Sequence, residues 1–439
     1  MMSKNTVIPE KYLVKNALIN YYLVLMFAVF PLFFTAQYSN IRHDKFYLFL
    51  VLSIILILCE LPLLIHSAVK NKSIGKLSFT DCTFAALIVI FTVSTVTSDY
   101  AFDSFVGESG RFCGLLTFVL FFFLYLVISR NFQYREYVFV IFAVAMLAVF
   151  ALCILNSFEI DPLGMYNGYS EETRKDFVST IGNKNIMSSL CCLCVPAFFM
   201  LFIRNKTGLR FFYLATSLIG FFAMIRCDSM SGYLGLFFVC VFLSLFYSFK
   251  SNKKLFWSLA VIYAIVVFAF AALFIYFTFF DLNTPLSGFM RFFRFDEKWG
   301  THRGYMWIKS FEIFKGYNLK SILFGCGPDT FYNVFQPYFD ELNSKFGDAV
   351  NNAAHNELLN YLITTGALGL AAYLSFIVSA VIRAVKAARK NILALVFIAP
   401  VVAYVFQSVA NLSTIIVLPI LFVFISLAEN ISHKELNAS

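Results

Sequence analysis

Residues Phe256 to Phe280 read FWSLAVIYAIVVFAFAALFIYFTFF and contain no charged side chain. A helix rises 1.5 Å per residue, so a helix of this length crosses a hydrocarbon core about 30 Å thick. Its backbone polar groups would all be satisfied inside the helix, as a bilayer requires. The stretch therefore predicts a transmembrane helix.

The rest of the chain has the same character. Of its 439 residues, 60% are hydrophobic and 13% are charged, and the mean hydropathy is +0.78. That composition leaves too little polar surface for a soluble globule. The first apolar run is followed by no small-residue cleavage pattern, so we expect it to be a helix and not a signal peptide. Apolar runs predict about twelve transmembrane helices, at residues 17–36, 46–67, 78–98, 113–129, 137–155, 186–203, 211–225, 231–248, 256–280, 356–382, 392–409 and 413–428.

The predicted fold class is therefore all-α, a single polytopic membrane domain over residues 1–439. Basic residues gather in alternate loops, which the positive-inside rule assigns to the cytoplasm together with both termini. The other side receives residues 98–110, 156–185 and a large extracytoplasmic loop, 281–355, before the tenth helix. The protein is thus expected in the cell membrane, plasma or inner. The residues on the basic side are Lys70, Lys72, Lys76, Arg204, Lys206, Arg210, Lys250, Lys253, Lys254, Arg383, Lys386, Arg389 and Lys390.

The net charge of +9 is mostly this orientation signal, because the basic residues are spread over short loops. We therefore exclude a nucleic-acid partner and expect membrane lipids around the chain. Cys191, Cys192 and Cys194 lie in an apolar run, where thiols behave as small hydrophobes; a metal site is the alternative. Cys227 and Cys326 fall in predicted outer loops, so a disulfide between them remains open.

The large loop carries most of the candidate chemistry. Its cations are interspersed with aromatic residues. This composition is typical of a surface that lies on the membrane or of an anion site. Gly325, Gly327 and Pro328 predict a tight turn. A phosphate-cradling loop is the alternative, although no Lys-Ser or Lys-Thr follows. The cations are Arg291, Arg294, Lys298, His302, Arg303 and Lys309.

His355 is predicted to lie in the first turns of an amphipathic helix. A helix N-terminus disfavours a protonated imidazole and attracts anions. A histidine there tends to stay neutral, as a general base beside a bound phosphate must. The alternative is a histidine that is merely hydrogen-bonded at the interface.

Other polar residues are predicted at the outer ends of helices. Arg111 and Arg226 either snorkel to the headgroups or bind an anion with a planar guanidinium. Asn183, Lys184 and Asn185 open a helix, where backbone N–H groups and amides can meet phosphate or sugar.

Three motifs of this region resemble the signature region of the O-antigen ligase and O-antigen polymerase superfamily. They are R-x-x-x-W at residues 303–307, G-x-G-P-x-x-F at 325–331, and H-N-E-x-L followed by G-x-x-G-L at 355–370. GNKN at 182–185 and GESGRFCGLL at 107–116 are similar to the same family, as is the twelve-helix layout with its large outer loop. The resemblance is centred on residues 288–372.

This resemblance implies a glycosyltransferase that takes a glycan from a polyprenyl-diphosphate donor at the outer face of the membrane. The acceptor is a glycan, a lipid or a protein, and no cofactor and no metal is implied. His355 is the expected catalytic base, and the expected diphosphate contacts are Arg303, Arg111 and Arg226, because arginines can stabilise the charge of the leaving group. The expected supporting residues are Asn356, Asn183, Lys184, Asn185 and His302.

One position departs from the family pattern. Members carry Ser-Arg where this sequence has Ser229 and Met230. Arg226, one helical turn earlier, is the expected replacement.

The motifs do not separate a ligase, including a protein O-glycosylating one, from a polymerase. A polyprenyl-linked glycan flippase or other secondary transporter is the alternative from a different class. We favour the enzyme, since transporters usually show two related halves and charged groups at the midplane. A non-catalytic scaffold is the remaining possibility, and it predicts that Arg303 and His355 tolerate replacement.

Overall fold

The computed structural model describes residues 10–70, 77–107, 110–347 and 353–437, and it is almost entirely helical. The predicted residues Lys72, Lys76 and 348–352, and two positions of the 107–116 motif, lie outside the described residues. Each of the twelve predicted spans coincides with a helix. These are α1 (Glu10–Val24, continued by the π-helix η1, Leu25–Val29, and by α2, Phe30–Leu32), α3 (Gln37–Lys70), α4 (Phe79–Val96), α6 (Leu115–Asn131), α7 (Glu136–Asn156), α9 (Lys184–Arg204), α10 (Leu209–Cys227), α11 (Met230–Ser251), α12 (Lys253–Ile275, continued by the π-helix η2, Tyr276–Phe280), α17 (Glu357–Ala388), α18 (Leu393–Ser408) and α19 (Leu418–Asn437).

Short elements connect the long helices. Two-residue strands β1 and β2 pair antiparallel, with Phe177 opposite Asn183. Most of the other short elements belong to the large loop between α12 and α17. In chain order the short elements are α5 (Ala101–Val106), α8 (Glu171–Arg174), β1 (Phe177–Val178), β2 (Gly182–Asn183), the 3-10 helix η3 (Gly288–Phe293), α13 (Trp299–Lys315), α14 (Leu319–Phe324), α15 (Phe331–Phe335), the 3-10 helix η4 (Gln336–Tyr338) and α16 (Phe339–Phe346).

The helix bundle is that of a multi-pass membrane protein, which confirms the predicted fold class. Eight of the described helices are long and apolar enough to cross a membrane, and three more apolar helices are shorter. The twelfth, α19, carries Glu429 in its second half, yet its residues 418–432 are all buried. It packs against α6, α17 and α18 and forms the centre of the bundle.

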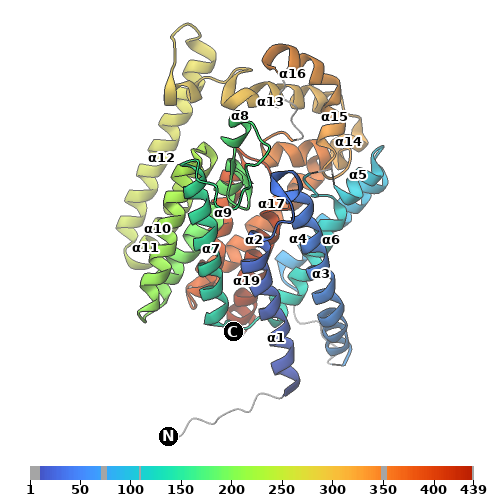
Figure 1. Cartoon of the computed structure of the whole chain (residues 1–439), viewed down its shortest axis with the longest axis vertical. Helices are drawn as coiled ribbons and strands as arrows, with labels where there is room; N and C mark the ends of the chain where they lie inside the picture. Colours follow the sequence, from blue (N-terminus) through green and yellow to red (C-terminus); the bar gives the residue numbers. More distant parts are fainter. Residues whose placement is uncertain (1–9, 71–76, 108–109, 348–352, 438–439) are drawn as a thin grey trace.

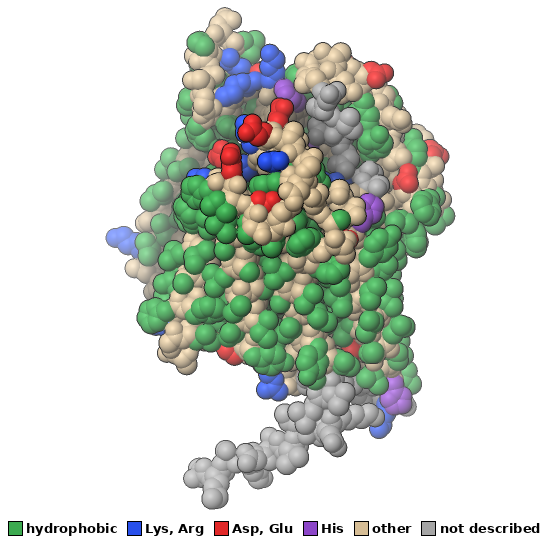
Figure 2. Space-filling view, viewed as in Figure 1, with side chains coloured by type: hydrophobic (Ala, Val, Ile, Leu, Met, Phe, Trp, Pro, Cys, Tyr) green, Lys and Arg blue, Asp and Glu red, His purple; other side chains and the backbone are tan. Residues whose placement is uncertain are grey.

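The bundle has two unlike ends. α13 to α16 cap one end, which we call the loop end, while α1 begins and α19 ends at the opposite end (Figure 1). The loops after α9, α11 and α17 lie at that opposite end, which we call the basic end. Figure 2 shows hydrophobic side chains across the helical part of this face, with charged side chains gathered mainly over the loop end.

α3 starts nine positions before the predicted residue 46, because a buried lysine stabilises the break that precedes it. Lys45 is fully buried. Its Nζ donates to the carbonyl oxygens of Phe30, Pro31 and Phe33 at 2.5, 2.8 and 2.8 Å. The carbonyls at the end of α2 have no helical partner, so the ammonium satisfies them inside the core.

The cysteines follow the packing prediction. Cys191, Cys192 and Cys194 are buried and free. The disulfide between Cys227 and Cys326 is not formed. Cys227 Sγ lies 3.7 Å from the Cys153 thiol, while Cys326 Sγ accepts hydrogen bonds from Tyr317 and Thr330.

Candidate active site

His355 lies just ahead of α17 and not in its first turns as predicted. The helix begins at Glu357 because the Asn356 side chain caps it, accepting a hydrogen bond from the Leu359 N–H at 3.1 Å. His355 itself has a left-handed backbone with φ 49°, and its Nδ1 atom is buried. The imidazole is therefore held by a bend in the chain beside the helix N-terminus.

Two arginines act electrostatically on this imidazole. The pKa of His355 is lowered to about 3, mainly by burial and in addition by the positive charges of Arg303 and Arg111. Arg303 and Arg111, both predicted as diphosphate contacts, are therefore close enough to His355 to influence its protonation. The arrangement keeps the imidazole neutral at physiological pH, with two cations beside it.

Arg303 reaches this place from α13. The first residues of α13 are left-handed at positions 300–302, and the regular helix follows. Arg303 Nη1 donates to the Ala410 carbonyl at 2.5 Å, in the loop between α18 and α19. Burial lowers the pKa of Arg303 from its usual value. On the same helix, Trp307 Nε1 donates to the Ala354 carbonyl at 2.9 Å, which ties α13 to the residue before His355.

Arg111 is fixed by an acidic partner from the large loop. Its Nε lies 3.3 Å from Asp329 Oδ1, and both side chains are almost fully buried. Arg111 Nη1 donates to Asn360 Oδ1 at 3.4 Å, and Asp329 Oδ2 accepts from the Cys113 N–H at 2.9 Å. A buried ion pair of this kind holds the guanidinium in one orientation.

The glycine-rich segment forms the predicted tight turn and docks it on α17. Gly325 and Gly327 have φ of 70° and 116°. The Cys326 and Gly327 N–H groups donate to the Thr364 carbonyl at 3.1 and 2.8 Å. α17 is kinked two residues further on, at Gly366, whose φ is 70°. The docked turn thereby places the Asp329 carboxylate beside the Arg111 guanidinium.

Residues 183–185 approach the same loop as Arg303, through structural bonds. Asn183 caps α9 and accepts from the Asn185 N–H at 2.8 Å, and the Lys184 N–H donates to the Asp176 carbonyl at 2.9 Å. Asn411 Nδ2 donates to the Asn185 carbonyl at 2.9 Å. The segment therefore supports the loop that contains Ala410.

A narrow cavity is lined by both His355 and Arg111, but not by Arg303 or by residues 183–185. It is lined by residues of the α5–α6 connection, the 325–329 turn, the start of α17 and the α18–α19 loop. Its polar lining comprises Arg111, Asp329, His355, Asn356, Glu357, Asn360, Thr364, Thr365, Asn411 and Ser413. The cavity thus brings together a neutral imidazole, the Arg111 guanidinium and amides, while Arg303 acts on the imidazole from outside the lining.

Residues 215–374 match a family model described as O-antigen ligase. Over this segment the chain is therefore similar to O-antigen ligases. The matched segment includes α13, the 325–329 turn and His355, whereas Arg111 and residues 183–185 precede it. This finding confirms the resemblance to the superfamily and supports glycan transfer of the ligase or polymerase type. No curated protein matches the chain.

Arg226 lies in the segment that matches the family model but contacts another part of the loop end. Its Nε and Nη2 donate to Ser157 Oγ and to the Ser157 carbonyl at 2.8 and 3.1 Å, and its guanidinium lies 4.5 Å from the Phe158 ring centroid. Met230, at the start of α11, is exposed. His302 stacks on Phe346, with ring centroids 4.1 Å apart. None of the three lines the cavity.

Three polar residues of the cavity were not predicted from the sequence, namely Asp329, Glu357 and Asn360. Glu357 is buried, and its Oε1 accepts from the Tyr373 hydroxyl at 3.2 Å. All three lie within or directly after the recognised motifs, so the motifs were the available signal. Their partners come from distant parts of the chain, and only the fold reveals them.

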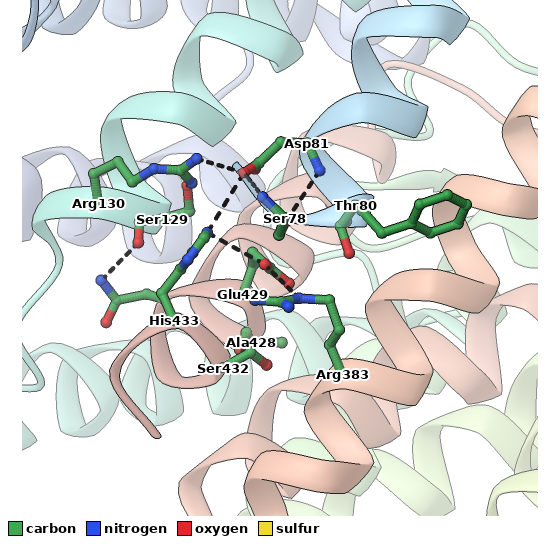
Figure 3. A network of polar contacts seen from close by, with 12 residues as sticks. Ser78, Thr80, Asp81, Ser129, Arg130, Arg383, Ala428, Glu429, Ser432 and His433 are labelled. Carbon is green, nitrogen blue, oxygen red and sulfur yellow. Dashed lines mark hydrogen bonds and ion pairs between the residues drawn. The ribbon is translucent and has the colours of Figure 1, made fainter. Parts of the chain in front are cut away.

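A second polar cluster lies far from His355, at the basic end, and joins α4, α6, α17 and α19 (Figure 3). Arg130 Nη2 lies 2.6 Å from Asp81 Oδ2, and Arg383 Nε lies 2.8 Å from Glu429 Oε1. His433 Nε2 lies between the two carboxylates, 3.7 and 3.3 Å away. Ligand atoms of Asp81, Glu429 and His433 are within 4.8 Å of one another, close enough for a cation. Two guanidiniums already balance both carboxylates, so a further positive charge would be poorly stabilised here.

Proposed function

We propose that this protein transfers a glycan from a polyprenyl diphosphate to an acceptor hydroxyl at the loop end of the bundle, with His355 as general base. The observation that carries the proposal is the neutral imidazole, with its Nδ1 atom buried, beside two guanidiniums. A base must be unprotonated, and a diphosphate leaving group needs positive charge close to it. Part of this proposed active site belongs to the large loop, 281–355.

The proposed reaction is a direct displacement. His355 accepts the proton of the acceptor hydroxyl as the acceptor oxygen bonds to the anomeric carbon. The bond between that carbon and the diphosphate oxygen breaks, and its electron pair leaves with the polyprenyl diphosphate. Arg303 and Arg111 stabilise the charge that develops on the phosphate oxygens. A single displacement of this kind inverts the configuration at the anomeric carbon.

Donor binding would also activate the base. The pKa of His355 is low through burial and through the positive charges of Arg303 and Arg111. A diphosphate bound to these arginines cancels their effect, so the pKa of His355 rises toward the operating pH. The imidazole then becomes a stronger base only when the donor is in place.

The two arginines would play unequal parts. One N–H of Arg303 donates to a backbone carbonyl, and a guanidinium has five such donors. Arg111 is partly neutralised by Asp329, so it contributes orientation as well as charge. The candidates for supporting roles remain Arg226, Asn183, Lys184, Asn185, Asn356 and His302. The contacts of Arg226 favour a role between α7 and α8 over one beside His355.

The membrane context fits this chemistry. A polyprenyl-linked glycan is anchored in the bilayer by its polyprenyl chain, so a multi-pass membrane protein is suited to act on it. We propose that the loop end faces away from the cytoplasm, in the cell or inner membrane, and that both termini are cytoplasmic. The acceptor decides between ligation and polymerisation.

The test is glycan profiling in native cells that carry the intact gene, a deletion, His355→Ala or His355→Gln. His66→Ala is the matched control, because His66 lies exposed near the basic end of α3. We expect both His355 variants to insert normally, to abolish the transferred or lengthened glycan, and to accumulate the lipid-linked donor. Single repeat units in that donor would indicate a polymerase, and finished chains a ligase.

Normal glycans in both His355 variants would show that the base assignment is wrong. If the intact purified protein transfers no glycan, and flux of the lipid-linked donor across the membrane survives the loss of His355, the flippase alternative gains support. The Gln variant matters because it retains hydrogen bonding and bulk, so a loss of activity there is not a loss of folding.

A further inference from the structure

A groove opens at the basic end, far from the proposed active site. It lies between the C-terminal parts of α11 and α17 and the start of α12, and its volume is about 540 Å³. We call it the basic-end groove. The side chains that matter here are four phenylalanines and two cations, namely Phe242, Phe246, Phe249, Phe256, Lys250 and Arg389.

The groove exists because α12 packs loosely. α11 and α12 are joined by a single residue, Asn252, whose Oδ1 accepts from the N–H groups of Lys254 and Leu255 at 2.9 and 3.2 Å. The turn forms a tight hairpin, yet no residue of α12 is buried. α12 runs along the edge of the bundle (Figure 1). The space between this hairpin and α17 is therefore left to be filled from the bilayer.

The groove has an apolar part and a charged part. Its wall is aromatic and aliphatic, while both of its charged residues lie at the C-terminal end of a helix. Lys250 is in the last turn of α11, and Arg389 is the C-cap of α17. The Arg389 guanidinium lies 5.5 Å from the Phe249 ring centroid. Among the residues that the structure describes, no acidic side chain lines the groove, so both cations are available to an anion.

We propose that the basic-end groove binds one anionic phospholipid, with its phosphate at Lys250 and Arg389 and its acyl chains against the phenylalanines. Basic pockets between membrane helices are the expected sites for anionic headgroups. The volume is in the range of ordinary ligand sites, about 300–1,000 Å³. The polyprenyl donor is a poorer fit, because its diphosphate belongs beside His355 at the opposite end.

The experiment is native mass spectrometry of the full-length protein, purified in detergent and incubated with equal amounts of phosphatidylglycerol and phosphatidylcholine. The first variant is Lys250→Gln/Arg389→Gln. The matched control is Lys206→Gln/Arg135→Gln, which removes one lysine and one arginine that are exposed and lie outside the groove. The second variant, Phe246→Trp, narrows the groove and keeps both cations.

We expect one phosphatidylglycerol to be retained by the intact protein and by the control. The cation variant should bind it about 30-fold more weakly, since each basic residue contributes about 1 kcal/mol and 1.4 kcal/mol is tenfold. Phe246→Trp should also lower retention. The proposal is wrong if phosphatidylcholine is retained equally, if both double variants behave alike, or if undecaprenyl phosphate displaces the lipid at lower concentration. None of these readouts depends on glycan transfer.

Discussion

At the residue scale, the proposed base has a pH signature of its own. The pKa of His355 is about 3 in the free protein, so the imidazole is unprotonated throughout the range from about pH 4 upward. The acid limb of kcat/KM, which reports the free enzyme, should therefore not fall near the ordinary histidine pKa of about 6.5. The acid limb of kcat, which reports the donor complex, should lie at higher pH because the donor charge raises the pKa of His355.

Rates of glycan transfer between pH 4 and 8, measured at low and at saturating donor, would test this prediction. Folding must be followed in parallel. The lowered pKa means that the unfolded chain binds the proton more readily, so this residue stabilises the fold above pH 6.5 and loses that contribution as the pH falls toward 3. Coincident acid limbs near pH 6.5 in both profiles would contradict the proposed electrostatics.

The same scale shows what the motifs could and could not predict. His355, Arg303 and Arg111 were singled out from separate segments, and the fold brings them together. Asp329 was missed because its partners are remote: Cys113, whose N–H it accepts, is 216 positions away. Lys45 was missed because the sequence does not show that its ammonium faces three backbone carbonyls at the end of the preceding helix. Local patterns identify reactive residue types, whereas the partners that orient them depend on tertiary contacts.

At the scale of elements, the kink in α17 is the feature on which the site geometry depends. Gly366 has φ 70° and ψ −175°, a region open essentially to glycine alone. A Cβ at this position would lie 2.4 Å from the Leu323 carbonyl carbon. We expect Gly366→Ala to destabilise the fold by about 2 kcal/mol or more and to reduce glycan transfer, because it pushes the 325–329 turn and Asp329 away from Arg111.

Thermal unfolding in detergent and transfer activity would measure both effects. Gly208→Ala is the control, since Gly208 has an ordinary helical φ and a Cβ there would meet no atom within 4 Å. An unchanged Gly366→Ala protein would mean that the turn and the kink are not coupled.

Hydropathy predicted all twelve long helices because the bilayer demands a fixed length of apolar helix, but their ends followed other rules. α17 begins where Asn356 caps it, and α3 begins at Gln37, after a break whose carbonyls bind the Lys45 ammonium. The buried network of Asp81, Arg130, Arg383, Glu429 and His433 was also invisible in the sequence, since each residue alone resembles a charge at a helix end. Only packing shows that they hold four helices together.

At the scale of the whole molecule, orientation decides whether the proposed site can meet its donor. The basic loops predict that the basic end is cytoplasmic, which leaves His355 on the far side of the membrane. Cysteine labelling in intact cells tests this directly. Asp340→Cys, exposed on α16, should react with a membrane-impermeant maleimide, whereas Lys206→Cys should react only after the cells are permeabilised.

The unsubstituted chain is the background control, because many of its ten cysteines are buried and inert, and its exposed Cys59, Cys82 and Cys240 lie on apolar helices where water is excluded. The reverse labelling pattern would place Arg303 and His355 on the cytoplasmic side. An outward-facing lipid-linked glycan could not reach them there, so the reversal would count against the transferase proposal while leaving the fold intact. The predicted pattern would instead place His355 and the two arginines on the same side of the membrane as the lipid-linked donor. The proposed displacement requires this arrangement.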